Sequence, residues 1–220
     1  MSRDPLIEFV EFVNKTSGQE KLCRLLQYGS KIFKWLERHD KTQVERWTAF
    51  STSMGMARKI IRFGKSIEII LNLTGKNGIR TFDGTVLKAL ELLGKFCLLM
   101  YFLFDHVIYV HKLKLLPVPE KLANRVAKLS DSAWMGDIVC GVSKSLIELS
   151  YSQGMSIDKK NTVYRNLVRN LLDFPVASHF LGLEWTKPIP EIVFGVCGAT
   201  TSLVSFYDMW PTPPATLKKQ

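Results

Sequence analysis

Residues 56–71 read MARKIIRFGKSIEIIL, a stretch in which four cations are interspersed with bulky aliphatic side chains. At about 100° of turn per residue, one half of a helix built from it carries large apolar side chains, namely Met56, Ile60, Phe63, Ile67, Ile70 and Leu71. The opposite side carries the basic residues Arg58, Lys59, Arg62 and Lys65. The stretch therefore predicts an amphipathic helix.

Two roles fit such a helix. A bundle helix would place its charged side in water and pack its apolar side against neighbouring helices. An interfacial helix would sink its apolar side below the lipid headgroups while its cations meet anionic phosphates, each contributing roughly 1 kcal/mol near an acidic leaflet. A nucleotide-binding phosphate loop is excluded, because Lys59 stands where the first glycine of that loop is required.

The whole chain is both basic and apolar. It has 220 residues, 46% of them hydrophobic, and a formal net charge of +10. This length fits one domain with a sizeable core, and the charge favours an anionic partner, either nucleic acid or an acidic lipid surface. Since no nucleic-acid recognition signature accompanies the charge, we expect anionic membrane lipid as the partner and no nucleic acid.

The residue types that carry catalysis or bind metals are scattered along the chain. Its four cysteines and four histidines show no metal-ligand spacing, and no cysteines form a C-x-x-C pair. No pairing of a nucleophile with a base emerges either. We therefore expect no enzymatic activity, no metal and no cofactor. The opening residues, MSRDPLIEFVEF, are not typical of a signal peptide, because acids interrupt their apolar run.

The apolar periodicity is helical almost throughout, without an alternating strand pattern or an internal repeat. We predict an all-α, membrane-associated helical bundle with amphipathic N-terminal helices and one or two hydrophobic membrane helices. The expected helices cover about 5–13, 19–38, 42–73, 84–111, 120–150, 158–181 and 189–210. Asp4-Pro5 is typical of a helix start, Ser17-Gly18 is interpreted as the first break, and Pro175 as a bend.

The last predicted helix, residues 189–210, has the properties of a membrane span. It makes about 33 Å of helix against a hydrocarbon core of about 30 Å, and its charges, Glu191 and Asp208, lie near the ends. One side carries small residues of the kind that let membrane helices approach closely, namely Gly195, Gly198, Ala199, Ser202 and Ser205. We predict deep insertion, with this small-residue track as a helix-packing seam.

The segment near residues 86–110 mixes apolar and polar signals. FCLLMYFLF (96–104) is unbroken apolar sequence, but a polar stripe runs along the same helix, formed by Lys88, Glu91, Lys95 and His106 with Asp105 beside it. Polar groups in hydrocarbon turn toward another helix or water. Two interpretations stay open, a membrane helix with a sealed polar seam or the central helix of a bundle. A membrane channel for small metabolites, lined by this stripe, is one alternative function, and a soluble helical adaptor for acidic partners is another.

Four blocks of the sequence, in order, resemble the peroxin 11 family of peroxisomal membrane proteins. They are TSGQEKLCRLLQYGSKIF (16–33), ARKIIRFGKSIE (57–68), YFLFDHVIYVHK (101–112) and the Gly/Ser-rich hydrophobic helix that ends in Trp210. Gln19-Glu20 departs from the Arg-Asp that is usual in the first block. Within the family, the chain is interpreted as the glycosomal version of kinetoplastid protists. Arg24, Gln27 and Tyr28 belong to the resembled motif, with helix packing as the role we expect.

The resemblance implies a protein embedded in the peroxisomal (glycosomal) membrane that promotes organelle elongation, division and proliferation. It also implies that the helix containing Ala57–Leu71 inserts shallowly into the cytosolic leaflet, that copies self-associate as a homo-oligomer, and that some relatives engage the dynamin-type fission machinery. A channel role is also attributed to the family.

Periodicity and resemblance together lead to one hypothesis. Arg58, Lys59, Arg62 and Lys65 recruit anionic lipid, and the apolar side from Met56 to Leu71 forms a wedge that expands one leaflet. The chain is treated as a single domain, residues 1–220. Within it, residues 1–78 are an amphipathic region facing the cytosol, and residues 79–220 are membrane-associated, with hydrophobic helices near 86–110 and 189–210. Both termini are expected to face the cytosol.

Overall fold

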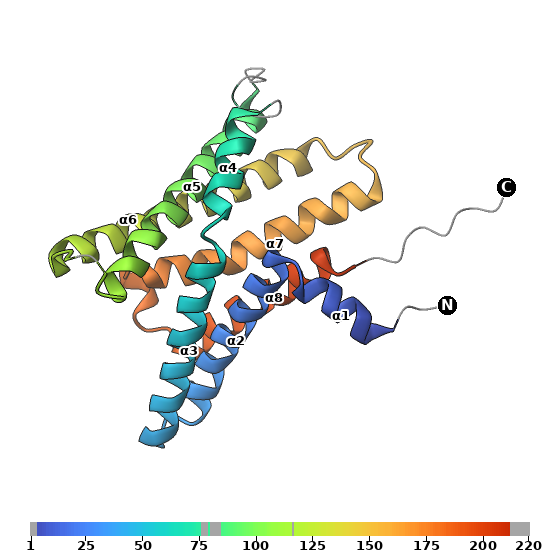
Figure 1. Cartoon of the computed structure of the whole chain (residues 1–220). Helices are drawn as coiled ribbons and strands as arrows, with labels where there is room; N and C mark the ends of the chain where they lie inside the picture. Colours follow the sequence, from blue (N-terminus) through green and yellow to red (C-terminus); the bar gives the residue numbers. More distant parts are fainter. Residues whose placement is uncertain (1–3, 76–78, 80–84, 116, 212–220) are drawn as a thin grey trace.

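A computed structural model describes residues 4–75, 79, 85–115 and 117–211. Over these residues the chain is an all-α bundle, as predicted (Figure 1). The described helices are α1 (Pro5–Val13), α2 (Thr16–Leu36), α3 (Lys41–Ile61), α4 (Lys65–Thr74), α5 (Val86–Lys112), α6 (Glu120–Ser150), α7 (Ile157–Phe180) and α8 (Glu191–Met209), with the short 3₁₀ turn η2 (Glu184–Thr186) before α8.

The break between the first two helices lies earlier than predicted. The carboxylate of Asp4 accepts a hydrogen bond from the Leu6 amide at 2.9 Å and starts α1 as expected. Ser17-Gly18, however, lies inside the first turn of α2. A Cβ atom on Gly18 would stand 2.0 Å from the Phe12 carbonyl oxygen, so this glycine permits close packing of α1 on α2. It was interpreted wrongly as a helix breaker.

The long helix predicted over residues 42–73 is two helices. The α-helical pattern stops at Ile61, passes through Arg62, Phe63 and Gly64, and resumes in α4 at Lys65. The chain changes direction between the two helices, next to Arg62, whose side chain is buried. The break makes α3 pack beside α2 while α4 packs on α5. In Figure 1, α2 and α3 run together toward one end of the molecule and α4 and α5 toward another.

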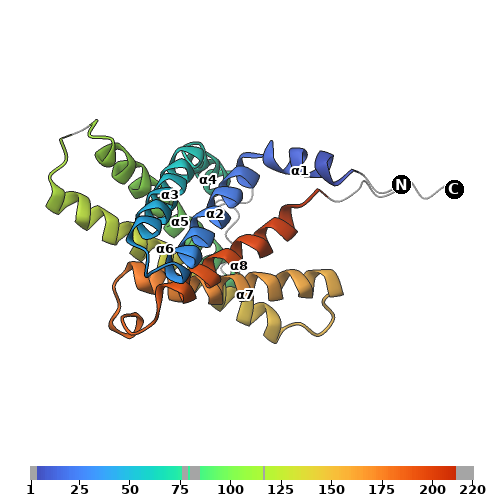
Figure 2. The same ribbon diagram turned by 90° about the horizontal axis from the view of Figure 1, so that it is seen from below.

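The remaining helices close a ring of neighbours. α5 packs on α6, α6 on α7, α7 on α8, and α8 returns to α2, as the view from below in Figure 2 also shows. The central apolar cluster consists of Tyr28 of α2, Val176 of α7 and Phe194 of α8. Pro175 lies inside α7, which continues through it. The central position of α2 means that helices from both predicted regions, 1–78 and 79–220, share one core.

The first and last helices, α1 and α8, contact each other through aromatic side chains. The buried Phe12 ring lies 4.4 Å from the Phe206 ring and 5.7 Å from the Trp210 ring, measured between centroids. The indole N–H of Trp210 donates a hydrogen bond to Glu8 at 2.9 Å. Through these and similar contacts, α1, α2 and α3 of the 1–78 region pack directly on helices of the 79–220 region.

Candidate functional site

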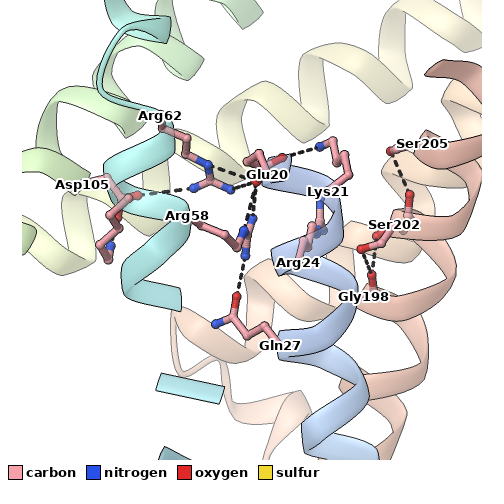
Figure 3. Close-up of polar contacts among 12 residues, drawn as sticks. Glu20, Lys21, Arg24, Gln27, Arg58, Arg62, Asp105, Gly198, Ser202 and Ser205 are labelled. Atoms are coloured by element: carbon pink, nitrogen blue, oxygen red, sulfur yellow. Dashed lines mark hydrogen bonds and ion pairs between the residues drawn. The ribbon is translucent and has the colours of Figure 1, made fainter. Parts of the chain in front are cut away.

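A buried carboxylate organises the inner face of α3. Glu20 of α2 is 2% exposed, and its Oε1 atom accepts hydrogen bonds from Arg62 at 2.6 Å and from Arg58 at 3.0 Å (Figure 3). Arg58 also donates to the side-chain oxygen of Gln27 at 2.7 Å. Burial alone would raise the pKa of Glu20, but the positive charges of Lys21, Arg62 and Arg58 outweigh it and hold that pKa well below its usual range.

The same network continues onto α5. Arg62 donates to the Tyr101 hydroxyl at 2.9 Å and to Asp105 at 3.3 Å. Lys59 pairs with the other oxygen of Asp105. Figure 3 shows Arg62 between Glu20 on one side and Asp105 on the other. Three helices are thus joined by charge-assisted hydrogen bonds in the protein interior, where such bonds are strongest.

The orientation expected for the basic residues is therefore wrong for most of them. Arg58 and Arg62 are 8% and 7% exposed, so the face that carries them is turned inward. Lys59 is partly buried and committed to Asp105. Lys65 is also partly buried but has no ion pair among the described residues. The physical reason is that Glu20 and Asp105, which lie outside the quoted stretch, offer these cations closer partners than headgroups could.

The apolar side of the same stretch points away from the protein. Ile60, Phe63 and Ile67 are 54%, 61% and 62% exposed, and Ile70 and Leu71 are exposed as well. Met56 is partly buried. Phe63 does touch one neighbour, the His106 ring of α5, with 4.5 Å between centroids. The result is the reverse of a water-soluble surface helix, since the charges lie inside and the large apolar side chains lie outside.

The neighbouring helix α5 also turns large apolar side chains outward. It exposes large apolar side chains at Leu93, Phe96, Leu103 and Val107. Part of its polar stripe is paired within the protein, because Glu91 pairs with Lys95 at 2.7 Å, with Lys144 of α6 at 3.4 Å and with Lys88 at 3.7 Å. The buried Nε2 atom of His106, in contrast, has no hydrogen-bond partner among the described residues. A polar seam closed by ion pairs is one of the two interpretations left open from the sequence. A solute path along this stripe stays a prediction.

α8 is the one helix among the described residues that is long and apolar enough to cross a membrane, over Glu191–Met209. Its small residues lie against α2: a Cβ atom on Gly198 would stand 2.3 Å from the Tyr28 ring, and one on Gly195 would stand 2.9 Å from Ile32. Ser202 is buried on the same side, and Ala199 packs against the core. Larger side chains of α8, including Val193, Val196 and Leu203, are exposed.

Sequence reasoning missed the acidic partners of the network. Glu20, Arg24 and Gln27 recur at helical spacing on α2, and this polar stripe was the available signal. Arg24 is buried and pairs with Asp173 of α7 at 2.5 Å. A cavity of about 820 Å³ lies between these helices and is lined by Glu20, Arg24, Arg58, Arg62, Asp105 and Asp173, among others. No periodicity argument predicts which distant helix supplies the partner.

The polar interior, the outward apolar side chains and the candidate membrane helix describe a membrane-associated helical protein. A sequence profile of Peroxisomal biogenesis factor 11 (PEX11) matches residues 6–156 and 151–210. Because these matches cover most of the chain, the protein belongs to the PEX11 family. It is a peroxisomal membrane protein of peroxisome biogenesis.

Individual relatives match over nearly their whole length. The chain is 29% identical to Peroxisomal membrane protein 11D of Arabidopsis thaliana, over 97% of this chain and 95% of the relative. It is 28% identical to Peroxisomal membrane protein 11-1 of Oryza sativa subsp. japonica, over 95% and 93%, and 22% identical to the Peroxisomal membrane protein 11 homolog of Dictyostelium discoideum, over 94% of each. No solved structure matches.

These comparisons confirm the family that the four sequence blocks resembled. A soluble adaptor is set aside, because the relatives are membrane proteins. The family consists of biogenesis factors, which agrees with the expectation that the chain is not an enzyme. The interpretation as a glycosomal version stays a prediction, as does the orientation of the termini.

Proposed function

We propose that this protein promotes elongation and division of the peroxisome by inserting the outward side of α3 and α4 into one leaflet of its membrane. Bulky side chains that enter one leaflet expand it relative to the other, and many copies together favour a curved tubule. Self-association into a homo-oligomer and recruitment of dynamin-type fission machinery are parts of the same proposal, supported by the family resemblance. So is the cytosolic position of both termini.

One observation carries the proposal, the reversed polarity of the α3–α4 segment. Ile60, Phe63 and Ile67 are more than half exposed while Arg58 and Arg62 are almost fully buried. Removing apolar surface from water is favourable by roughly 25 cal/mol per Å², so three large side chains in contact with acyl chains supply several kcal/mol. Such a surface is typical of a lipid-facing segment.

Anionic lipid contributes less to membrane binding in this proposal than the sequence alone suggested. Three of the four cations assigned to headgroups are paired with Glu20 or Asp105. Lys65, at the first turn of α4, remains as a headgroup contact next to Ile67. The net charge of +10 supplies a general attraction to an acidic leaflet, which salt screens.

The test is remodelling of acidic vesicles by the purified full-length chain. We expect the wild-type protein to turn spherical vesicles into tubules, and Phe63→Glu and Ile67→Glu to lower the tubule count at least tenfold, because a buried carboxylate in the acyl region is strongly unfavourable. Electron microscopy of vesicles at a fixed protein-to-lipid ratio measures this.

A matched control is Ile157→Glu. Ile157 is the first residue of α7 and is more exposed than the wedge side chains, but it lies outside the α3–α4 surface. This variant should form tubules like the wild type. Equal tubulation by the wild type, Phe63→Glu and Ile67→Glu would rule out the wedge.

A further inference from the structure

The cavity between the helices is large enough for a ligand and is reached from the surface. Its volume of about 820 Å³ falls in the range of small-molecule sites. α2, α3, α4, α5, α6 and α7 all contribute to its wall, and the exposed residues Thr52, Glu68 and Lys112 are part of the lining. A cavity lined by these six helices is a feature that the wedge proposal does not use.

The charge of the lining is unbalanced. Eight cationic side chains and six carboxylates line the cavity, which leaves an excess of two positive charges when all are ionised. Two of the carboxylates, Asp131 and Asp137, lie on α6, and burial raises the pKa of each to about 6. Burial, together with Arg24 and Arg62 and against the opposing effect of Glu20, lowers the pKa of Lys21 to about 8. Because its lining contains more cations than carboxylates, the cavity favours an anion over a cation.

Arg24 is the most direct indication of where an anion binds. Its side chain is buried and lines the cavity, and its terminal nitrogen is occupied by Asp173. Its Nε atom is also buried but has no hydrogen-bond partner. A guanidinium N–H that is removed from water without a partner is costly, and a phosphate oxygen is a ligand that fits its geometry. Lys21 lies one helical turn before Arg24 and lines the same cavity, with its ammonium 3.2 Å from the Glu20 carboxylate.

We propose that this cavity binds a phosphate group, with the Nε–H of Arg24 and the ammonium of Lys21 as its contacts. A dianionic phosphate matches the excess of two positive charges in the lining. The group is supplied either by a soluble phosphate ester or by the headgroup of an anionic lipid, since both present the same oxygens. The exposed wedge side chains Ile60, Phe63 and Ile67 do not line the cavity, although Met56 and Lys65 of the same stretch do.

Calorimetric titration of the full-length protein in neutral detergent, at constant ionic strength, tests the site with inorganic phosphate as the probe. The wild type should bind one phosphate per chain. Replacing the buried pair by R24Q/D173N removes the contact without leaving a carboxylate unpaired, and should weaken binding at least tenfold. Lys21→Met keeps the bulk of a partly exposed side chain and should weaken binding several-fold. Because this change also removes a charge that pairs with Glu20, the circular dichroism of the variant at the titration temperature must match that of the wild type.

The matched control is K34M/E191Q. It removes a lysine–glutamate pair at 2.8 Å between α2 and α8, outside the cavity, and should leave phosphate binding unchanged. If the wild type binds no phosphate, or if Lys21→Met and R24Q/D173N bind it like the wild type, the site does not exist. An equal loss in K34M/E191Q would mean that binding depends on no particular ion pair, which also overturns the proposal.

Competition separates the two sources of the phosphate group. Short-chain phosphatidate that displaces inorganic phosphate in the wild type identifies a lipid headgroup as a competent ligand. Phosphate binding that phosphatidate does not displace assigns the cavity to soluble esters. Phe63→Glu should bind phosphate like the wild type in either case, so failure of the wedge and failure of this site are distinguishable.

Discussion

The α3–α4 segment and α8 both turn large apolar side chains outward, but their inner faces are held by opposite kinds of contact. The inner face of α3 is charged, with Arg58 and Arg62 bound to Glu20. The inner face of α8 is small and close-fitting, with Gly195 and Gly198 against α2. Both faces meet α2, so one central helix positions two segments with outward apolar surfaces.

The difference shows which contacts can fix the orientation of a helix whose outer side faces lipid. Where the outside is as apolar as the usual protein core, the hydrophobic effect no longer decides which face turns inward. Directional ion pairs can decide it, as in α3, and so can backbone approach that only glycine permits, as in α8. For α3, we expect the free energy of unfolding to fall sharply when one partner of its ion pairs (the charged seam) is removed. For α8, we expect it to fall in proportion to the side-chain volume added at the packed glycines.

The largest effect should come from removing the central carboxylate of the charged seam. Glu20→Ala leaves Arg58 and Arg62 buried with their main partner gone, and breaking a buried ion pair on one side costs about 3–5 kcal/mol. The free energy of unfolding in detergent, from denaturant titration, measures it. A loss below about 1 kcal/mol would show that the seam does not hold α3.

Gly198→Ala should have the next largest effect. The added Cβ would stand 2.3 Å from the Tyr28 ring, so α8 must move away from α2, at a cost of about 1–3 kcal/mol. Gly29→Ala on α2 is the matched control, because no atom lies within 4 Å of its added Cβ. This control should be neutral or stabilising by up to about 1 kcal/mol, since alanine favours helix. Equal effects of the two variants would contradict close packing of α8.

The smallest effect should be a difference in acid sensitivity. Because the folded-state pKa of Glu20 is depressed below 4.5, its contribution to stability is full above pH 4.5 and is lost as the pH falls through the folded pKa. Asp131 and Asp137 act with the opposite sign between pH 3.8 and about 6, since burial raises their pKa values. Comparing wild type with Glu20→Gln isolates the first contribution.

The measurement is the unfolding free energy of both proteins from pH 7 down to the acid transition. Below pH 4.5 the wild type should lose stability more steeply than Glu20→Gln, which has no carboxylate to protonate at that position. Parallel curves would mean that Glu20 is not charged in the folded protein. Gly198→Ala, which changes no titratable group, should run parallel to the wild type throughout.

Several elements could be predicted because their signals are local. Asp4 before Pro5 starts α1, Pro119 caps the first turn of α6, and the apolar run that follows Ile189 forms α8. In contrast, the break at Arg62–Gly64 was missed although Gly64 follows a last turn that carries Arg58 and Lys59, because the amphipathic pattern continues on both sides of it. Gly18 looks like a breaker but is a packing residue, because its role depends on how α1 packs on α2.

The candidate site, like the fold, was predicted from the sequence only in part. Spacing predicted that the aliphatic and basic side chains of residues 56–71 lie on two different sides. In the structure Ile60, Phe63 and Ile67 are exposed while Arg58 and Arg62 are buried, although the helix is interrupted at Arg62–Gly64. Which side turns inward was not predicted, because the answer depends on Glu20 and Asp105, 38 to 46 residues away from the cations they bind.

Sequence by itself determined that this protein is all-helical, basic, rich in amphipathic and apolar segments and a member of its family, because composition, periodicity and local motifs are properties of the chain alone. Tertiary structure alone decided that the basic half of α3 lies inside, that Gly198 meets Tyr28, and that Arg24 opens onto a charged cavity. The physical reason is that a charge or a glycine acquires its role only from the partner that folding brings to it.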